Sequence, residues 1–443
     1  MSNLLIKGGT VVNGSDLVVA DVLIEDGQVI ELGPQLGQPG GCESLDATGC
    51  YVMSGLVDLH CHMREPGFEE SETIETAARA GARGGYTCLV AMPNTVPAID
   101  SPQMVEMIRQ KADRTVVDVQ VAGAITQGRK GECLAEIYEM AKAGVRIFTD
   151  DGAGVQDSRL MLNALRYSVV GDLVMAQHCE EASLARGGHI NDGVISSQLG
   201  ISSTPREAEE TMAYRDVLLA KKTGARLHLL HVSTSNTLDI VRQARAWGVK
   251  VTCEVTPHHL LLSEDDVVTL NPDMKVNPPL RTLDDCRKLA LGLLDGTIDA
   301  VATDHAPHHI DNKTQPFEDC AFGMTGLETA FGVIFTLLTR GTVSGKSKIL
   351  EPINEREAIG LVHTTMSMNP AKIAGVSNQQ GGPLRCGALA NVLVVDPRAS
   401  WVVDRTKLSS KSKNTPFDGL ELFGKVIHTI SKGRLVVKDG ELL

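Results

Sequence analysis

The order of apolar and polar residues predicts a chain whose two ends differ from its middle. Up to about residue 50, short apolar runs alternate with the dipeptides Asn13-Gly14 and Asp26-Gly27. These dipeptides supply the positive φ that tight hairpin turns need. From about residue 390 the same pattern returns and ends at Asp439-Gly440. Because chain termini often lie close together, we expect residues 1–53 and 380–443 to build one small β-sandwich domain.

The middle of the chain alternates short apolar runs with segments that suit helices. Eight runs are candidate strands: 56–59, 87–92, 117–125, 145–148, 173–176, 226–230, 250–255 and 298–303. Eight strands alternating with helices over about 250 residues is the size of a (β/α)₈ barrel. A doubly wound open sheet would need a glycine-rich turn after its first strand, and His60-Cys61-His62 stands there instead. We therefore predict an α/β fold in which residues 54–379 form a TIM-like barrel.

Composition narrows the class of protein further. The 443 residues include 42 Lys and Arg against 55 Asp and Glu, a formal net charge of −13. This balance disfavours a nucleic-acid partner, which would require a basic face. No apolar run reaches the roughly 18 residues of a membrane span, no secretory signal is visible, and the ten cysteines are scattered without a CxxC pair. We expect a cytoplasmic protein with reduced cysteines and no membrane partner.

Side chains able to bind metal follow five of the predicted strands, where active sites of barrels lie. They are His60 and His62 after the first strand, Asp150 and Asp151 after the fourth, His178 after the fifth, His231 after the sixth and Asp304 after the eighth. His60 and His62, two residues apart on a strand, point to one face, with Cys61 on the other. Hydrogen-bonded core histidines are the alternative, but so many at one end of a barrel are improbable.

The mixed set of imidazoles and carboxylates has too many members for one tetrahedral ion. A binuclear site in which a carboxylate bridges two metals explains the excess. Such a site lowers the pKa of bound water and stabilises a developing oxyanion, so hydrolysis, or its reversal, at a carbonyl carbon follows. Asp150 and Asp151 are rivals for the bridging position, because adjacent residues at a strand end point to opposite sides.

Six motifs carry a resemblance to a known family. They are DLHCHMREPG at 58–67, AMPNT at 91–95, TDDG at 149–152, HCE at 178–180, NPPLR at 277–281 and ATDHAPH at 302–308. In this order they resemble the dihydroorotases of the amidohydrolase superfamily. Hydantoinases, allantoinases and the shorter dihydroorotases of that superfamily place a carbamylated lysine after the fourth strand. The aspartates here, with no lysine between Phe148 and Gly152, are similar to the long, type I bacterial class.

The resemblance implies a ligand set and a substrate pocket. His60, His62 and Asp304 would bind one metal and His178 and His231 the other, with Asp151 favoured over Asp150 as the bridge. The implied metal is zinc, one or two ions per subunit, with two favoured. Substrate contacts would come from His62, Arg64, Asn94, Asn277, His308 and the backbone of Phe322 and Gly323.

Arg64 is expected on the same strand face as His62, where its planar fork suits the carboxylate of dihydroorotate. A surface ion pair of Arg64 with Glu65 or Glu69 is the alternative, as is a turn-forming role for Asn94. His258 and His259 also tempt a metal interpretation, and for them we expect a structural role.

The reaction implied is the reversible cyclisation of N-carbamoyl-L-aspartate to L-dihydroorotate and water in pyrimidine biosynthesis. In the direction of ring opening a metal-bound hydroxide would attack the ring amide carbonyl, with Asp304 as general base and then general acid. Two alternatives stay open. One is another cyclic amidase, an allantoinase or hydantoinase, and the other is an inactive relative that scaffolds aspartate transcarbamoylase. A homodimer and an association with aspartate transcarbamoylase are further partners that the resemblance allows.

Overall fold

The computed structural model describes residues 3–343 and 345–443. Met1 and Ser2 of the predicted small domain and Ser344 of the predicted barrel lie outside these ranges. Each of the eight predicted barrel strands has a counterpart. They are β6 (Leu56–Cys61), β7 (Tyr86–Ala91), β8 (Asp118–Val121), β9 (Ile147–Phe148), β10 (Val174–Gln177), β13 (Arg226–Leu229), β14 (Val251–Val255) and β15 (Ala300–Val301).

These strands form a closed ring. Hydrogen bonds join them in two parallel runs, β6-β7-β8 and β9-β10-β13-β14-β15. Two parallel bridges, Gly123 with Phe148 and Cys61 with His305, connect the runs at both junctions. At the second junction the N–H of His62 donates to the carbonyl of His305 at 2.9 Å. The order of strands in the ring follows the chain, as a (β/α)₈ barrel requires.

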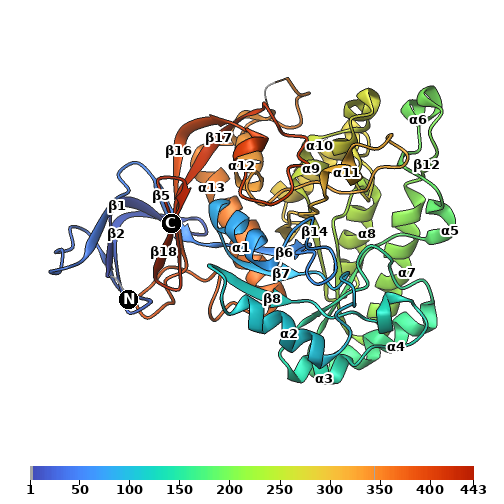
Figure 1. Ribbon diagram of the computed structural model, residues 1–443, viewed down its shortest axis with the longest axis horizontal. Coiled ribbons are helices and arrows are strands. Elements are labelled where there is room, and N and C mark those ends of the chain that lie inside the picture. The colour runs from blue at the N-terminus through green and yellow to red at the C-terminus, as the bar shows by residue number, and fades with distance from the viewer. Residues whose placement is uncertain (1–2, 344) are drawn as a thin grey trace.

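Helices surround this ring (Figure 1). The longer ones are α1 (Ile74–Arg83), α2 (Pro102–Ala112), α4 (Ser158–Ser168), α7 (Glu207–Thr223), α8 (Ser235–Ala246), α10 (Leu283–Leu294), α12 (Ala330–Arg340) and α13 (Glu355–His363), with the shorter α3 (Ile137–Lys142) and α14 (Asn369–Ala374). Local sequence explains where several begin. The side chain of Thr73 caps α1 and that of Thr282 caps α10, each by accepting from the N–H three residues on, which satisfies a helix N–H that has no partner within the helix.

The loops that follow the barrel strands carry short elements of their own. These are α5 (Ala182–Ala185), β11 (Ile190–Asn191), α6 (Val194–Leu199) and β12 (Ser203–Thr204) after β10, α9 (Pro257–Leu261) after β14, and α11 (Ile310–Lys313) after β15. Since all eight strands are parallel, these loops lie at one end of the ring, the mouth of the barrel.

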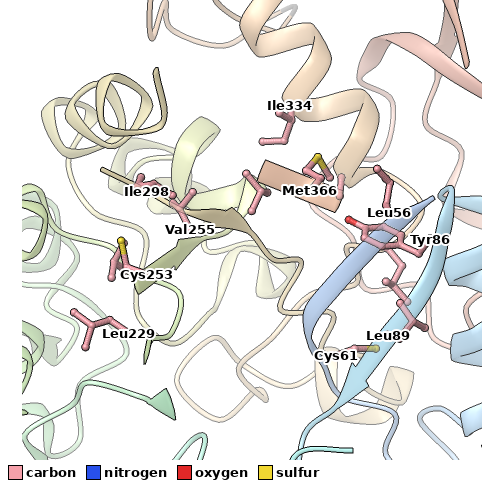
Figure 2. Close-up of a cluster of buried hydrophobic side chains, with 14 of the residues drawn as sticks. Leu56, Cys61, Tyr86, Leu89, Leu229, Cys253, Val255, Ile298, Ile334 and Met366 are labelled. Atoms are coloured by element: carbon pink, nitrogen blue, oxygen red, sulfur yellow. The ribbon is translucent and has the colours of Figure 1, made fainter. Parts of the chain in front are cut away.

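The outer faces of the strands pack against the helices. Leu56 of β6 and Tyr86 of β7 are fully buried in one cluster with Ile334 of α12 and with Met366, and Figure 2 shows these four side chains gathered between the strands and the helix. Burial of such side chains stabilises the fold by roughly 1.5–3 kcal/mol each. One core therefore lies between ring and helices, and a second buried cluster joins alternate strand residues such as Val57 and Val90 to Ala371 of α14. Both leave the polar strand ends free to face the mouth.

Both ends of the chain contribute to a second sheet. Within the described residues it has nine strands: β1 (Leu4–Asn13), β2 (Asp16–Glu25), β3 (Gln28–Gly33), β4 (Glu43–Asp46), β5 (Tyr51–Ser54), β16 (Val392–Val402), β17 (Glu421–Ser431), β18 (Arg434–Lys438) and β19 (Glu441–Leu442). The N-terminal half meets the C-terminal half where Met53 of β5 pairs with Leu393 of β16. The two chain ends lie on the same side of the molecule (Figure 1). The domain limits at 53/54 and 379/380 remain a prediction.

Two further sequence expectations can be compared with the structure. Among the described residues, no helix is both long and apolar enough to cross a membrane. The ten cysteines are all free thiols, and eight of them are buried.

Candidate metal centre

Six side chains from the strand ends converge inside the mouth of the barrel. On one side, Nε2 of His60 lies 3.3 Å from Oδ1 of Asp151 and 3.5 Å from Oδ1 of Asp304. Nε2 of His62 lies 3.0 Å from Oδ1 of Asp304 and 3.5 Å from Oδ2 of Asp151. All four side chains are buried. His60 of β6 and His62, directly after its last residue, therefore reach one centre, as predicted.

The other two histidines lie across the same carboxylate. Nδ1 of His178 and Nε2 of His231 are 3.7 and 3.5 Å from Oδ1 of Asp151, and 2.9 Å from each other. Two ligand groups result, His60 with His62 and Asp151, and Asp151 with His178 and His231. Asp151 is the member that both groups share.

The donor atoms fit divalent cations. Ligands bonded to a tetrahedral ion at about 2.1 Å are spaced about 3.4 Å apart, and the nitrogen-to-carboxylate separations of 3.0–3.7 Å match that spacing. In the described part of the chain, Nε2 of His60 is buried without a hydrogen-bond partner, although carboxylates flank it. A buried polar atom of this kind needs a partner, and a cation would provide one. Imidazole and carboxylate together suit zinc and its neighbours.

The electrostatics of the site keep both carboxylates charged. Burial alone would raise the pKa of Asp151, but His60, His178 and His231 hold it well below its ordinary value. Burial likewise opposes ionisation of Asp304, and His60 and His62 hold its pKa below the usual range. Both groups are therefore available as anionic ligands at neutral pH.

A residue that the sequence analysis missed orients His60. Nδ1 of His60 donates to Oε1 of Glu254 at 2.9 Å, and Oε2 of Glu254 accepts from Nε2 of His228 at 3.1 Å. Carboxylates in this position fix the tautomer of a metal-binding histidine, which here turns Nε2 toward the centre. Glu254 lies in the apolar run 250–255, and an acid in a strand buried on both faces is the signal that could have revealed it.

Glu254→Gln is expected to weaken metal binding by about 10- to 100-fold, the usual effect of removing such an outer partner. The amide keeps the shape of the side chain but carries no charge to pair with His60. Metal retained per chain during titration with a chelator measures the effect. Glu328→Gln provides the control, because that side chain accepts from the N–H groups of Ser409 and Ser410 elsewhere. Equal retention by both variants would contradict the role of Glu254.

The rivals Asp150 and Asp151 point in different directions. Asp150 accepts from the N–H groups of Ile125 and Thr126 at 2.8 and 3.0 Å and from the Thr126 hydroxyl. These bonds tie the end of β9 to the segment after β8 and occupy Asp150 away from the histidines. Of the two rivals, Asp151 is therefore the one that lies at the centre.

Three of the predicted site residues have a left-handed backbone conformation, which residues other than glycine rarely adopt. The φ angles are +60° at Arg64, +30° at His231 and +46° at Asp304. Such conformations cost on the order of 1–3 kcal/mol each and cluster at functional sites. The expectation that Arg64 shares a strand face with His62 is wrong, since β6 ends at Cys61 and the positive φ redirects the chain.

The predicted substrate contacts line one cavity of about 220 Å³ beside the metal ligands: His62, Arg64, Asn94, Asn277, His308, Phe322 and Gly323. Nε of Arg64 donates to the carbonyl of Pro307 at 3.0 Å. Nη2 of Arg64 lies 3.1 Å from Nε2 of His308, which is only 2.7 Å from the carbonyl of Phe322. At that shorter distance Nε2 donates to the carbonyl, so the Nη2 hydrogens stay available to a ligand.

Neither alternative for the pocket residues fits these contacts. Among the described residues Arg64 makes no ion pair with Glu65 or Glu69, and Glu65 pairs with Lys111 instead. Asn94 is held in the site, because its Oδ1 accepts from Nδ1 of His62 at 2.9 Å. Burial lowers the pKa of Arg64 to about 10, which leaves it a cation at neutral pH.

His259 and the backbone of Gly323 make hydrogen bonds within the protein, away from the metal ligands. Nε2 of His259 donates to the carbonyl of Pro278 at 3.0 Å and its Nδ1 lies 2.8 Å from the Thr256 hydroxyl, which agrees with a structural role. The N–H of Gly323 donates to the carbonyl of Lys275 at 2.8 Å. That N–H is therefore already used within the protein.

The chain was compared with protein-family models and with curated proteins. A family model described as "Dihydro-orotase-like" matches residues 49–237. The chain is 45% identical over 437 residues to the curated "Dihydroorotase" of Thermoanaerobacter sp., spanning 98% of this chain and 97% of that protein. It is 43% identical over 438 residues to the "Dihydroorotase" of Pelotomaculum thermopropionicum, spanning 98% and 99%.

A solved structure, the L-hydantoinase (dihydropyrimidinase) from Arthrobacter aurescens, is also similar. It superposes with a TM-score of 0.87 at 26% sequence identity, covering 100% of this chain and 98% of that one. The similarity extends over both the barrel and the terminal sheet. The predicted fold class, a TIM-like barrel with a small β-sandwich domain, is thereby confirmed.

Proposed function

Because the chain belongs to the dihydroorotase family, we propose that its barrel mouth catalyses the reversible cyclisation of N-carbamoyl-L-aspartate to L-dihydroorotate and water, a step of pyrimidine biosynthesis. The observation that carries the proposal is a carboxylate, Asp151, shared by two pairs of histidines beside a cavity that presents Arg64. The carboxylate and histidines suit hydrolysis of an amide, and the cavity with Arg64 suits a ring that carries a carboxylate.

We infer that the centre holds two zinc ions. His60, His62 and Asp304 would hold one, His178 and His231 the other, and Asp151 would bridge them. When bound, such ions lower the pKa of water and polarise a carbonyl oxygen. The donor spacing and the unpartnered Nε2 of His60 support two cations, and the mixture of nitrogen and oxygen donors supports zinc.

The residues opposite the centre would orient the ring. The guanidinium of Arg64 would bind the substrate carboxylate through its free Nη2 hydrogens, with Asn94 and His308 beside it. Asn277 and the backbone of Phe322, with Gly323 beside it, would hold the ring edge, and His62 would contact both substrate and metal. Holding the reacting carbonyl close to the centre converts a bimolecular reaction into one within a single complex.

Asp304 would move the proton. Its Oδ1 faces His60 and His62, which leaves Oδ2 for proton transfer. During ring opening the ionised carboxylate takes a proton from the attacking water and returns it to the departing ring nitrogen. Cyclisation reverses both transfers. The low pKa of Asp304 keeps it in the form that accepts a proton first.

The deciding experiment pairs metal analysis of the purified protein with turnover of three substrates. We expect about two zinc ions per chain, and turnover of dihydroorotate at least about 100-fold faster than that of hydantoin or allantoin. Comparable turnover of hydantoin would establish the other cyclic amidase, and metal without turnover of any ring would establish the inactive relative. The intact ligand set argues against the latter.

Arg64→Met is expected to raise KM for dihydroorotate by about 10- to 100-fold, with a smaller change in kcat, because a hydrogen bond to a charged group contributes roughly 1.5–3 kcal/mol. Methionine keeps the length of the side chain and adds no new branch at the positive φ. Steady-state kinetics measure the change. Arg226→Met is the control, since Arg226 pairs with Asp172 at the exposed base of β13. An unchanged KM in Arg64→Met would remove Arg64 from the pocket.

We extend the proposal to assembly, as a homodimer that associates with aspartate transcarbamoylase, the enzyme class whose product is carbamoyl-aspartate. Family membership supports both. Light scattering of the protein alone, and after mixing with that enzyme, would measure the masses. A monomer in both samples would contradict this part of the proposal alone.

A further inference from the structure

Two lysine side chains are buried behind the wall of the cavity that lies opposite the metal ligands. Lys275 is 1% exposed and Lys313 is 4% exposed. Among the described residues, neither Nζ atom forms an ion pair within 4.0 Å, and the acidic groups that act on them, Asp319 and Glu318 on Lys275 and Asp273 on Lys313, lie farther away. Burying an ammonium without a close counter-charge is unfavourable, so a fold that buries two of them against one loop requires an explanation.

Both ammonium groups bind carbonyl oxygens of one loop. Nζ of Lys275 donates to the carbonyls of Glu318 and Cys320 at 2.7 and 2.8 Å. Nζ of Lys313 donates to the carbonyls of Ala321 and Gly323 at 2.8 and 2.9 Å. Four carbonyls within six residues thus converge on two positive charges. The loop 318–323 takes its shape from them.

The lysines come from the two loops that supply the rest of this wall. Lys275 stands two residues before Asn277, and Lys313 stands five residues after His308. The loop they hold carries Phe322 and Gly323, and all four of these pocket residues line the cavity. Nζ of Lys275 also lies 4.5 Å from the ring centroid of Phe322. The two ammonium groups therefore join the three loops that form the substrate side of the pocket.

Their charge has a consequence for the ligand. The carbonyls are neutral, so they stabilise the ammonium groups without cancelling their charge, and Lys313 reaches the carbonyl of Gly323, which itself lines the cavity. In a buried environment such charges act over longer distances than in water. Burial lowers the pKa of Lys313 to about 8, which leaves it mainly protonated at neutral pH.

We propose that Lys275 and Lys313 are positioning residues that make the pocket select an anionic, carboxylated ring over the neutral ring of the same shape. The inference rests on the proposed function and deepens it, because it explains why this barrel mouth would take dihydroorotate in preference to a neutral cyclic amide. Arg64 binds the carboxylate directly. The lysines act through the loop they shape and through the charge they place behind it.

The test compares two rings that differ only in the carboxylate, dihydroorotate as substrate and dihydrouracil as competitive inhibitor. In Lys275→Met and Lys313→Met, KM for dihydroorotate is expected to rise about tenfold or more, the order expected on removing one nearby charge. The inhibition constant of dihydrouracil is expected to change less than about threefold, and metal per chain to stay unchanged, since no metal ligand is touched. Lys288→Met, at an exposed lysine of α10, is the matched control.

The outcomes separate a charge effect from a structural one. If binding of both rings weakens in parallel, the lysines only support the loop, and selection by charge is overturned. Lys275→Arg and Lys313→Arg keep the charge and are expected to retain the preference where the methionine variants lose it. If no variant folds, wild type alone decides: a preference for dihydroorotate over dihydrouracil below about tenfold overturns the inference. Absence of any dihydroorotate turnover by metal-loaded wild type would instead refute the proposed function.

Discussion

Asp304→Asn is expected to lower kcat by about 10²- to 10⁴-fold, the usual contribution of a general acid–base group, while KM for dihydroorotate changes far less. Asparagine preserves the side-chain shape and keeps an oxygen near Nε2 of His62, which lies 3.0 Å from Oδ1 of Asp304. It cannot accept and return a proton at neutral pH. Steady-state kinetics in both directions, with metal per chain measured on the same samples, test the expectation.

Two controls make this result interpretable. Asp157→Asn should leave both parameters unchanged, because Asp157 caps α4 through Leu160 and asparagine caps helices as well as aspartate does. Metal content separates proton transfer from ligation, since a loss of activity that parallels a loss of metal reports only the ligand role. Near-normal turnover by fully metal-loaded Asp304→Asn would refute the proton shuttle.

The adjacent variants Asp151→Asn and Asp150→Asn are expected to fail in different ways. Asp151→Asn should lose metal, from about two ions per chain to one or fewer, and with it nearly all turnover, because one carboxylate serves both ligand groups. Asp150→Asn should keep its metal but lose about 1.5–3 kcal/mol of unfolding free energy, because the neutral amide removes the charge that Ile125 and Thr126 bind and its nitrogen cannot accept from the Thr126 hydroxyl.

Metal analysis and chemical denaturation of both proteins measure this contrast. The pair is matched in chemistry and differs by one position in the chain, so each variant serves as the control for the other. Loss of metal from Asp150→Asn with full retention in Asp151→Asn would reverse the assignment and make Asp150 the bridging ligand.

Several features of the site could be predicted because they depend on local pattern. The period of two along the first barrel strand placed His60 and His62 on one face, and they do converge. The succession of apolar runs placed the other ligand residues after strands, and parallel strands bring their carboxyl ends to one rim. Motif similarity then supplied Arg64, Asn94 and His308, which line a single cavity.

Other features could not be predicted, because they depend on where the chain bends and which groups meet. The first barrel strand ends at Cys61, and Arg64 beyond it has a positive φ, which periodicity cannot anticipate. Glu254 lies within an apolar run, and its role in orienting His60 follows only from its contact with that residue, 194 positions away. Lys275 and Lys313 resemble surface lysines in the sequence, and only the fold buries them together.

The sequence by itself determined the alternation of strands and helices, the type of ligand at each strand end and the family to which these motifs point. Those properties follow from side-chain chemistry and from repeats only a few residues long. The tertiary structure decided which carboxylate faces the histidines, which groups orient them and which charges stand behind the substrate pocket. These depend on separations of a few ångströms between residues far apart in the chain, and closure of the barrel is what brings such residues together.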